Sequence, residues 1–264
     1  INGFNFKDIG LIKKMMALTS SRGPDNQDFF ETEEYTVGHN RLSIIDPEKR
    51  SNQPYYYKNF VLSFNGEIYN YIEIKNRLIS KGYSFDTTSD TEVIIKLFDL
   101  EGTNSFKELS GIFSISIYDV KLKKLYLVRD VVGVKPLYYH YDLKNKKFIF
   151  SSLISSILIS LKDKKLNYEA LNSYSNFNRN DYRETFFKNI FKVLPGEMIE
   201  VYNENYKRTK ILNFKFNWNK DEKELTSDIG KKFSNQFLSD VPVALSLSGG
   251  YDSNIILQEL LKNK

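Results

Sequence analysis

The 264 residues suffice for one large domain or two ordinary ones, and the 41% hydrophobic and 15% aromatic residues are ample for a core. The sequence has no cysteine and only His39 and His140 as histidines, which excludes disulfides and thiolate metal sites and argues against a histidine metal site or a Ser-His triad. The net charge of +5 is spread over Lys-rich turns and does not form one basic face. No apolar run approaches the ~20 residues of a membrane span, and no leader precedes the first strand. We therefore expect no nucleic-acid partner, no membrane segment and a cytoplasmic location.

Apolar spacing predicts hairpins alternating with helices over residues 1–203, taken as the first domain. Strands are expected at 1–6, 28–34, 35–40, 60–64, 111–119, 124–130, 137–141 and 148–152, with residues 39–46 continuing as a strand into a proline turn, and with two short strands around a tight turn at 194–197. Helices are expected at 9–18, 69–81 and 93–101, the last capped by Ser89 or Asp90, and Asn65-Gly66 is expected to form a turn. This pattern predicts an α+β fold with antiparallel sheets covered by helices.

The composition changes after residue 203. Residues 204–221 are polar and are predicted to be a linker; a helix at 222–238, a buried strand at 241–247 and a helix at 254–261 follow. Because one strand with flanking helices cannot bury a parallel sheet, we expect residues 222–264 to be the start of a truncated second domain.

A glycine loop lies between the last strand and the last helix. This arrangement directs backbone N–H groups and the positive end of a helix dipole toward an anion. Gly249 and Gly250 allow close approach to phosphate oxygens, Ser248 and Ser253 offer hydroxyls, and Asp252 suits Mg²⁺ or a helix N-cap. A phosphate site is favoured over a surface turn capped by Asp252 and Ser253.

A second group of polar residues is scattered through the first domain. Arg41 suits a carboxylate, Glu67 and Asp90 suit an ammonium, and Asn65 with the N–H of Gly66 could stabilise an oxyanion. Together they would recognise an α-amino acid and polarise its side-chain carbonyl. Spacing alone favours the ordinary alternatives, namely a surface ion pair for Arg41, a hairpin turn at Asn65-Gly66 and a helix cap at Asp90.

Nine motifs in one order decide between these interpretations: INGF at the start, RGPD (22–25), RLSIID (41–46), FNGEIYN (64–70), SDTEV (89–93), LSGIFSISIYD (109–119), RDVVGVKPLYY (129–139), LPGE (194–197) and SGGYDS (248–253). Over its whole length the chain resembles glutamine-dependent asparagine synthetases. The resemblance implies a class II glutamine amidotransferase domain with the αββα sandwich of N-terminal-nucleophile enzymes, followed by the first βα unit of an α/β ATP-pyrophosphatase domain. It also implies that glutamine, ATP, Mg²⁺ and a carboxylate, aspartate by default, are used, and that relatives are often homodimers.

The resemblance assigns roles residue by residue. Arg41 would hold the glutamine carboxylate, Leu42, Ile44 and Ile45 would line the pocket, and residues 22–25 would shape the loop beside the nucleophile. Asn65 and Gly66 would form the oxyanion hole, and Glu67 and Asp90 would hold the α-amino end of glutamine. Leu247 would contact ATP, and the pyrophosphate and its Mg²⁺ would be bound by Ser248, Gly249, Gly250, Asp252 and Ser253, with Asp252 as the metal ligand.

The chain also departs from the family pattern. The family nucleophile is an amino-terminal Cys, expected two residues before Ile1, so the chain as written is expected not to hydrolyse glutamine. Truncation of the sequence is favoured over natural loss of the nucleophile, because the glutamine-pocket residues persist; natural loss would leave a glutamine-binding or structural domain. Other departures suggest a member acting on a different carboxylate, such as a sugar acid: Val131, Val132, Leu153, Tyr251 and Asn254. A β-lactam-forming synthetase is disfavoured because the glutamine-pocket residues persist.

Overall fold

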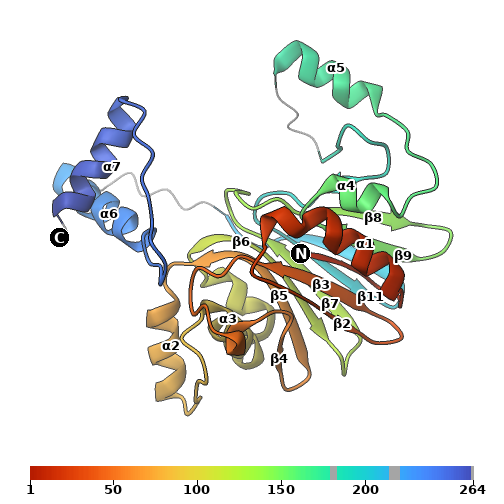
Figure 1. Ribbon diagram of the computed structural model, residues 1–264, viewed down its shortest axis with the longest axis horizontal. Coiled ribbons are helices and arrows are strands. Elements are labelled where there is room, and N and C mark those ends of the chain that lie inside the picture. The colour runs from red at the N-terminus through yellow and green to blue at the C-terminus, as the bar shows by residue number, and fades with distance from the viewer. Residues whose placement is uncertain (179–182, 214–220, 263–264) are drawn as a thin grey trace.

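Two six-stranded antiparallel sheets stack face to face in a computed structural model that describes residues 1–178, 183–213 and 221–262 (Figure 1). The first sheet has the order β10 (Phe191–Lys192), β8 (Tyr138–Asp142), β9 (Lys147–Ser151), β1 (Asn2–Phe4), β3 (Thr36–Arg41), β2 (Asn26–Glu31). The second has the order β12 (Asn205–Lys210), β11 (Glu197–Tyr202), β7 (Lys124–Arg129), β6 (Gly111–Asp119), β5 (Phe60–Ile68), β4 (Tyr55–Tyr57).

The core between the sheets is built from the alternate residues of each strand that face inward. Tyr35 and Tyr118 stack there with ring centroids 4.1 Å apart, and the Tyr35 hydroxyl bonds Ser116 Oγ at 2.9 Å. The hydroxyl needs this partner because an unpaired buried polar group is costly. Burial of the side chain raises the pKa of Tyr35 far above its ordinary value.

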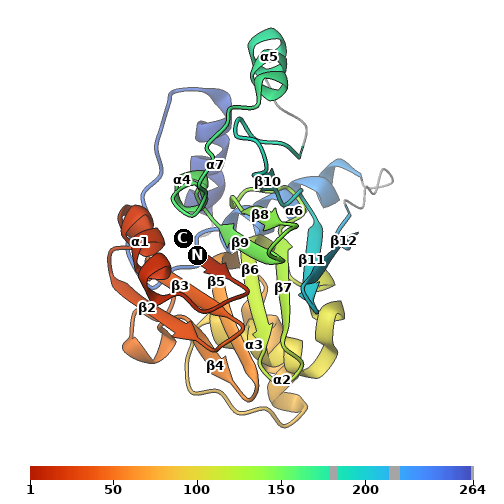
Figure 2. The ribbon, with the colours of Figure 1, turned by 90° about the vertical axis from the view of Figure 1, so that its right-hand side faces the viewer.

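Helices cover the outer face of each sheet (Figure 2). On the first sheet lie α1 (Ile9–Thr19) and α4 (Ile154–Leu158), and on the second lies α3 (Asp90–Glu101), with α2 (Tyr71–Ser80) packed against α3. The apolar faces of α1 and α3 are buried, for example at Met15 and Ile95. A further helix, α5 (Tyr168–Phe177), lies away from the sandwich. These four layers confirm the predicted α+β class and the αββα sandwich.

Three predictions, for residues 65–66, 205–210 and 39–46, differ from the structure. Asn65-Gly66 is not a turn: β5 continues to Ile68 because all of its residues pair with β6. Residues 205–210 are not linker, since β12 pairs with β11 from Asn205 to Lys210. The predicted strand at 39–46 ends as β3 at Arg41, and a loop follows. Part of the predicted linker, residues 214–220, lies outside the described residues.

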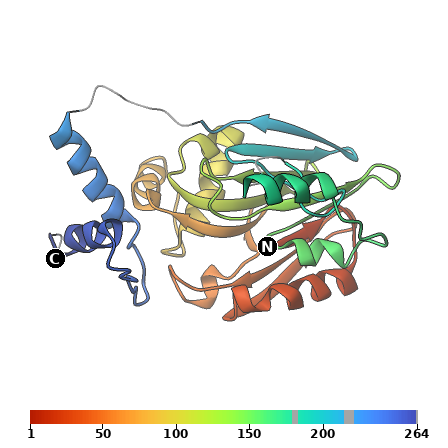
Figure 3. The same ribbon diagram turned by 90° about the horizontal axis from the view of Figure 1, so that it is seen from above.

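The C-terminal helices α6 (Glu222–Asn235) and α7 (Tyr251–Lys262) contact each other and lie outside the sandwich (Figure 3). The predicted strand at 241–247 is wrong: these residues form no strand, and Val243 and Leu247 are both 52% exposed. A strand needs a neighbour for its backbone N–H and C=O groups, and none lies beside this segment in the described part of the chain. Among residues 1–178, 183–213 and 221–262, no helix is long and apolar enough to cross a membrane.

Candidate functional site

A cavity of about 280 Å³ lies where β3 and β5 end, beside the first residue of α3. All eight residues that the resemblance assigns to glutamine line this cavity: Arg41, Leu42, Ile44, Ile45, Asn65, Gly66, Glu67 and Asp90. Arg41 and Asn65, which are 24 positions apart in the sequence, therefore line the same cavity. Ile1 also lines the cavity, and its backbone nitrogen donates to Ser152 Oγ at 3.1 Å.

Arg41, the last residue of β3, turns its guanidinium toward the loop that follows. It donates to the carbonyls of Ile45 (3.2 Å), Asp46 (2.5 Å) and Glu48 (3.0 Å) and to Asn52 Oδ1 (2.9 Å). These four bonds use most of the five N–H donors of a guanidinium. Arg41 thus shapes the 42–46 loop, and burial lowers its pKa from the ordinary value.

The loop between α1 and β2 holds the other side of residues 42–46. Asp25 accepts from Ser43 N at 2.7 Å, and its own N–H donates to Arg41 O at 3.0 Å. Only glycine fits two residues earlier, because a Cβ on Gly23 would lie 2.1 Å from Asn40 O. Residues 22–25 thus contact the start of the 42–46 loop, and their role beside the nucleophile stays a prediction.

Asn65 and Gly66 both line the cavity, and each carries a donor that could serve there. Asn65 Nδ2 is buried and has no hydrogen-bond partner among the described residues. The Gly66 N–H lies on the same strand edge as those of Phe64 and Ile68, because N–H direction alternates along a strand. Phe64 N donates to Gln53 Oε1 (2.6 Å) and Ile68 N to Asp90 Oδ2 (3.1 Å), so this edge faces away from β6.

Gly66 is also required by sterics. Its φ is +153°, and a Cβ would lie 2.0 Å from Ile112 O on β6. No side chain fits there without separating the two strands. The close approach of β5 and β6 thus places the backbone at the cavity, which a hairpin turn at Asn65-Gly66 would not do.

Two carboxyl groups, Asp90 and Glu67, share the cavity. Burial raises the pKa of Asp90 to about 7, against the hydrogen bond from Ile68 N, and the negative charge of Glu67 adds to the rise. Burial also raises the pKa of Glu67, while the positive charge of Lys135 opposes this. Ser89 caps α3 by accepting from Thr91 N (3.1 Å), which fixes Asp90 at the helix start. Arg22, Arg41 and Lys135 also line the cavity, and the two carboxyl groups among them suit a cationic amino group.

Three further lining residues were missed from the sequence. His39 Nδ1 bonds Ser63 Oγ at 2.9 Å and so joins the two sheets beside the cavity, where burial lowers its pKa well below the ordinary value. Gln53 fixes β5 through Phe64 N, and Lys135 lies in the RDVVGVKPLYY motif. Lys135 had a sequence signal in that motif, whereas His39 and Gln53 had no pattern that pointed to the site.

The glycine loop lies apart from this cavity, at the start of α7. Ser248 Oγ bonds Ser253 Oγ (3.2 Å), Gly250 N donates to Ser248 Oγ (3.3 Å), and Gly249 has a φ of +81°. The loop is solvent-exposed, and Tyr251 is 89% exposed. The residues predicted to bind ATP and pyrophosphate, Leu247, Ser248, Gly249, Gly250, Asp252 and Ser253, all lie in this segment of seven residues.

A metal ion at the glycine loop would need a bound phosphate to complete its coordination. No group of three or more His, Asp or Glu side chains suited to a metal ion occurs among residues 1–178, 183–213 and 221–262. Mg²⁺ commonly takes one or two carboxylates together with substrate phosphates and water. The single carboxylate of Asp252 therefore fits Mg²⁺ that arrives with a phosphate ligand.

The fold is that of a class II amidotransferase. Two solved structures cover 79% of this chain and 48% of their own: glutamine phosphoribosylpyrophosphate amidotransferase from B. subtilis (TM-score 0.55, 18% identity) and "the allosteric regulatory enzyme of purine biosynthesis" (TM-score 0.56, 17% identity). At this identity the likeness concerns the fold alone.

The sequence comparisons identify the family. The glutamine amidotransferase domain family matches residues 1–212, and the chain belongs to it. "Asparagine synthetase [glutamine-hydrolyzing] 1" of Bacillus subtilis is 35% identical over 94% of this chain and 40% of its own length. A putative asparagine synthetase 2 of Methanocaldococcus jannaschii is 31% identical over 93% and 53%, and asparagine synthetase B of Escherichia coli 29% over 92% and 40%. The chain thus spans about half or less of these relatives, and the predicted resemblance is confirmed.

Proposed function

We propose that the cavity binds glutamine and hydrolyses its side-chain amide, and that the ammonia passes to a carboxylate activated by ATP. The observation that carries the proposal is the buried Asn65 Nδ2, which has no partner among the described residues; Asn65 lines the cavity together with Gly66, Arg41 and Asp90. A preorganised donor without a ground-state partner suits an oxygen that becomes negative only during reaction.

The residues take these roles in the proposed reaction. The thiol of the amino-terminal Cys expected ahead of Ile1 gives its proton to the free α-amino group and attacks the side-chain amide carbon of glutamine, so that the carbonyl oxygen carries the negative charge between Asn65 Nδ2 and Gly66 N. When the carbonyl re-forms, the C–N bond breaks, the α-amino group returns the proton to the nitrogen, and ammonia leaves. Water then releases glutamate from the thioester. Ionised Asp90 and Glu67 hold the α-ammonium, and Arg41 holds the loop and the carboxylate end. Since Ile1 lies in the cavity wall, a Cys two residues ahead of it would lie within reach of the cavity.

The acceptor reaction is proposed from the relatives' names and from the glycine loop. The relatives are asparagine synthetases, so aspartate is the default acceptor, with another carboxylate as the variant. Pyrophosphate would be held at Ser248, Gly249, Gly250 and Ser253, with Mg²⁺ on Asp252 and the nucleotide against Leu247. Such an ATP-consuming ligase belongs in the cytoplasm.

One assay of the full-length protein tests both halves. With glutamine, ATP, Mg²⁺ and aspartate, we expect glutamate, AMP, pyrophosphate and asparagine. Glutamate without AMP would support the amidotransferase and refute the ATP-dependent half. AMP only with another carboxylate would replace aspartate, and no glutamate with any acceptor would refute glutamine hydrolysis. Glutamine binding without hydrolysis would favour the nucleophile-less alternative.

A further inference from the structure

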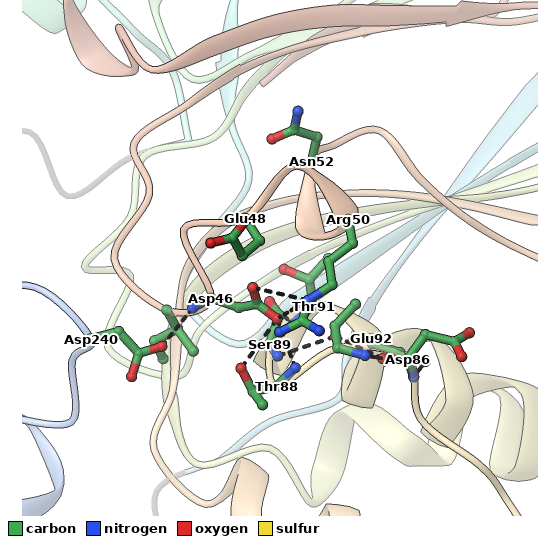
Figure 4. Close-up of polar contacts among 12 residues, drawn as sticks. Asp46, Glu48, Arg50, Asn52, Asp86, Thr88, Ser89, Thr91, Glu92 and Asp240 are labelled. Carbon is green, nitrogen blue, oxygen red and sulfur yellow. Dashed lines mark hydrogen bonds and ion pairs between the residues drawn. The ribbon is translucent and has the colours of Figure 1, made fainter.

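The pocket loop 42–46 is anchored at its far end by Asp46. Asp46 has a φ of 46°, which is uncommon for a residue with a side chain, and it is only 2% exposed. Its carboxylate accepts from Thr88 N (2.8 Å), Thr88 Oγ1 (3.1 Å) and Arg50 Nε (3.1 Å), as Figure 4 shows. Burial of Asp46 opposes ionisation, but these bonds outweigh it and lower its pKa. The side chain therefore connects the pocket loop to the segment that leads into Asp90.

The backbone of the same loop is held by a residue nearly 200 positions later. Asp46 N donates to Asp240 Oδ2 at 2.7 Å (Figure 4). Asp240 N in turn donates to Ile44 O at 3.0 Å. Ile44 and Asp46 are the residues before and after Ile45, so the two bonds hold the backbone on both sides of one residue of the pocket wall. We call this pair of bonds the Asp240 clamp.

The residues around Asp240 form a defined turn, which gives the clamp a fixed base. Ser239 Oγ donates to Val241 O (2.9 Å) and accepts from Val241 N (3.2 Å). Ser248, the first residue of the glycine loop, follows Asp240 by eight positions, and α6 ends five positions before it. The clamp therefore joins the segment that carries the glycine loop directly to the glutamine pocket.

We infer that Asp240 is a positioning residue for glutamine: through its clamp, the segment that carries the glycine loop sets the conformation of Ile44–Asp46 and hence the affinity for glutamine. This rests on the proposed function. Asp240 does not line the cavity, so it acts through the loop backbone. Because coupling between two ligands is reciprocal, whatever orders the 239–253 segment from the ATP side strengthens glutamine binding, and glutamine strengthens ATP binding equally.

Three variants of the full-length protein test the clamp. Asp240→Ala removes the acceptor, Asp240→Asn keeps an oxygen acceptor, and Asp221→Ala is the matched control, since Asp221 Oδ1 accepts one backbone bond, from Glu224 N at 2.8 Å, in the same part of the chain. We expect Asp240→Ala to raise the KM for glutamine about tenfold with kcat within about twofold, the size of one charge-assisted bond. Asp240→Asn should restore most of the affinity, and Asp221→Ala should leave KM unchanged.

Hydrogen exchange of the Asp46 amide, measured without glutamine, gives a readout independent of the reaction. We expect it to accelerate at least about tenfold in Asp240→Ala and not in Asp221→Ala. Equal exchange and equal KM in these two variants would overturn the inference. A wild-type protein that neither binds nor hydrolyses glutamine would refute the proposed function instead, and the Asp46 exchange would still decide whether the clamp holds the loop.

Discussion

Replacing Asn65 by alanine tests the proposed oxyanion site most directly. Asn65 Nδ2 has no partner among the described residues, so its loss breaks no hydrogen bond of that atom in the resting protein. We expect the free energy of unfolding to change by less than about 1 kcal/mol, because no new buried group is left unpaired. Loss of one oxyanion donor costs about 2.7–4 kcal/mol in the transition state, a fall in kcat of about 100- to 1,000-fold.

The assay is glutamate release by the full-length protein at saturating glutamine, with KM expected within about threefold of wild type because the donor acts mainly in the transition state. Asn59→Ala is the matched control with the opposite pattern. Asn59 Nδ2 donates to Asp119 Oδ1 at 2.7 Å away from the cavity, so this variant should lose about 0.5–1.5 kcal/mol of stability and keep its kcat. If Asn65→Ala keeps kcat within about threefold of wild type, the assignment of Asn65 to the oxyanion is refuted.

Three further results are expected. The pKa of Asp90, about 7, lies above its ordinary 3.8, so its contribution to stability is present below about pH 4 and lost as the pH rises through 7. Glutamine binding needs the ionised form of Asp90, so calorimetry should show the Kd for glutamine falling about tenfold from pH 6 to pH 8. The same pH dependence of Kd in Asp90→Asn would contradict this. Gly66→Ala places a Cβ 2.0 Å from Ile112 O and should cost about 3 kcal/mol in urea unfolding; an unchanged midpoint would mean that β5 and β6 separate without cost. Lys96→Met leaves the 0%-exposed Glu92 carboxylate without its 2.5 Å ion-pair partner and should lower the free energy of unfolding by about 3–5 kcal/mol. The Glu92→Gln, Lys96→Met double variant should recover part of this stability. A double variant as unstable as Lys96→Met would argue against the pair.

Local patterns were enough to predict most of the helices and hairpins. The apolar spacing at 9–18 became α1, which begins after Asp8, whose side chain accepts from Leu11 N. The hairpin at 111–119 and 124–130 formed as β6 and β7 because both strands alternate inward and outward residues. Such patterns act over a few residues, so they do not depend on distant partners.

The failures have a shared cause, which is that strand formation depends on a neighbour. Asn65-Gly66 has the composition of a turn, but β6 pairs with both residues and keeps them extended. Asn205–Lys210 looks like linker but pairs with β11, while the apolar residues 241–247 lack a neighbouring strand and stay irregular. Pairing across long sequence separations cannot be deduced from one segment alone.

Short motifs and the family resemblance were enough to name eight residues that line one cavity, but not His39 or Gln53. How these residues meet depends on the packing of the whole fold. Stacking of the two sheets closes one cavity around Arg41, Asn65 and Asp90, burial of Asp90 raises its pKa, and the Asp240 clamp ties the pocket loop to the glycine-loop segment. These properties depend on distances and desolvation, which arise only when segments far apart in the chain are packed together.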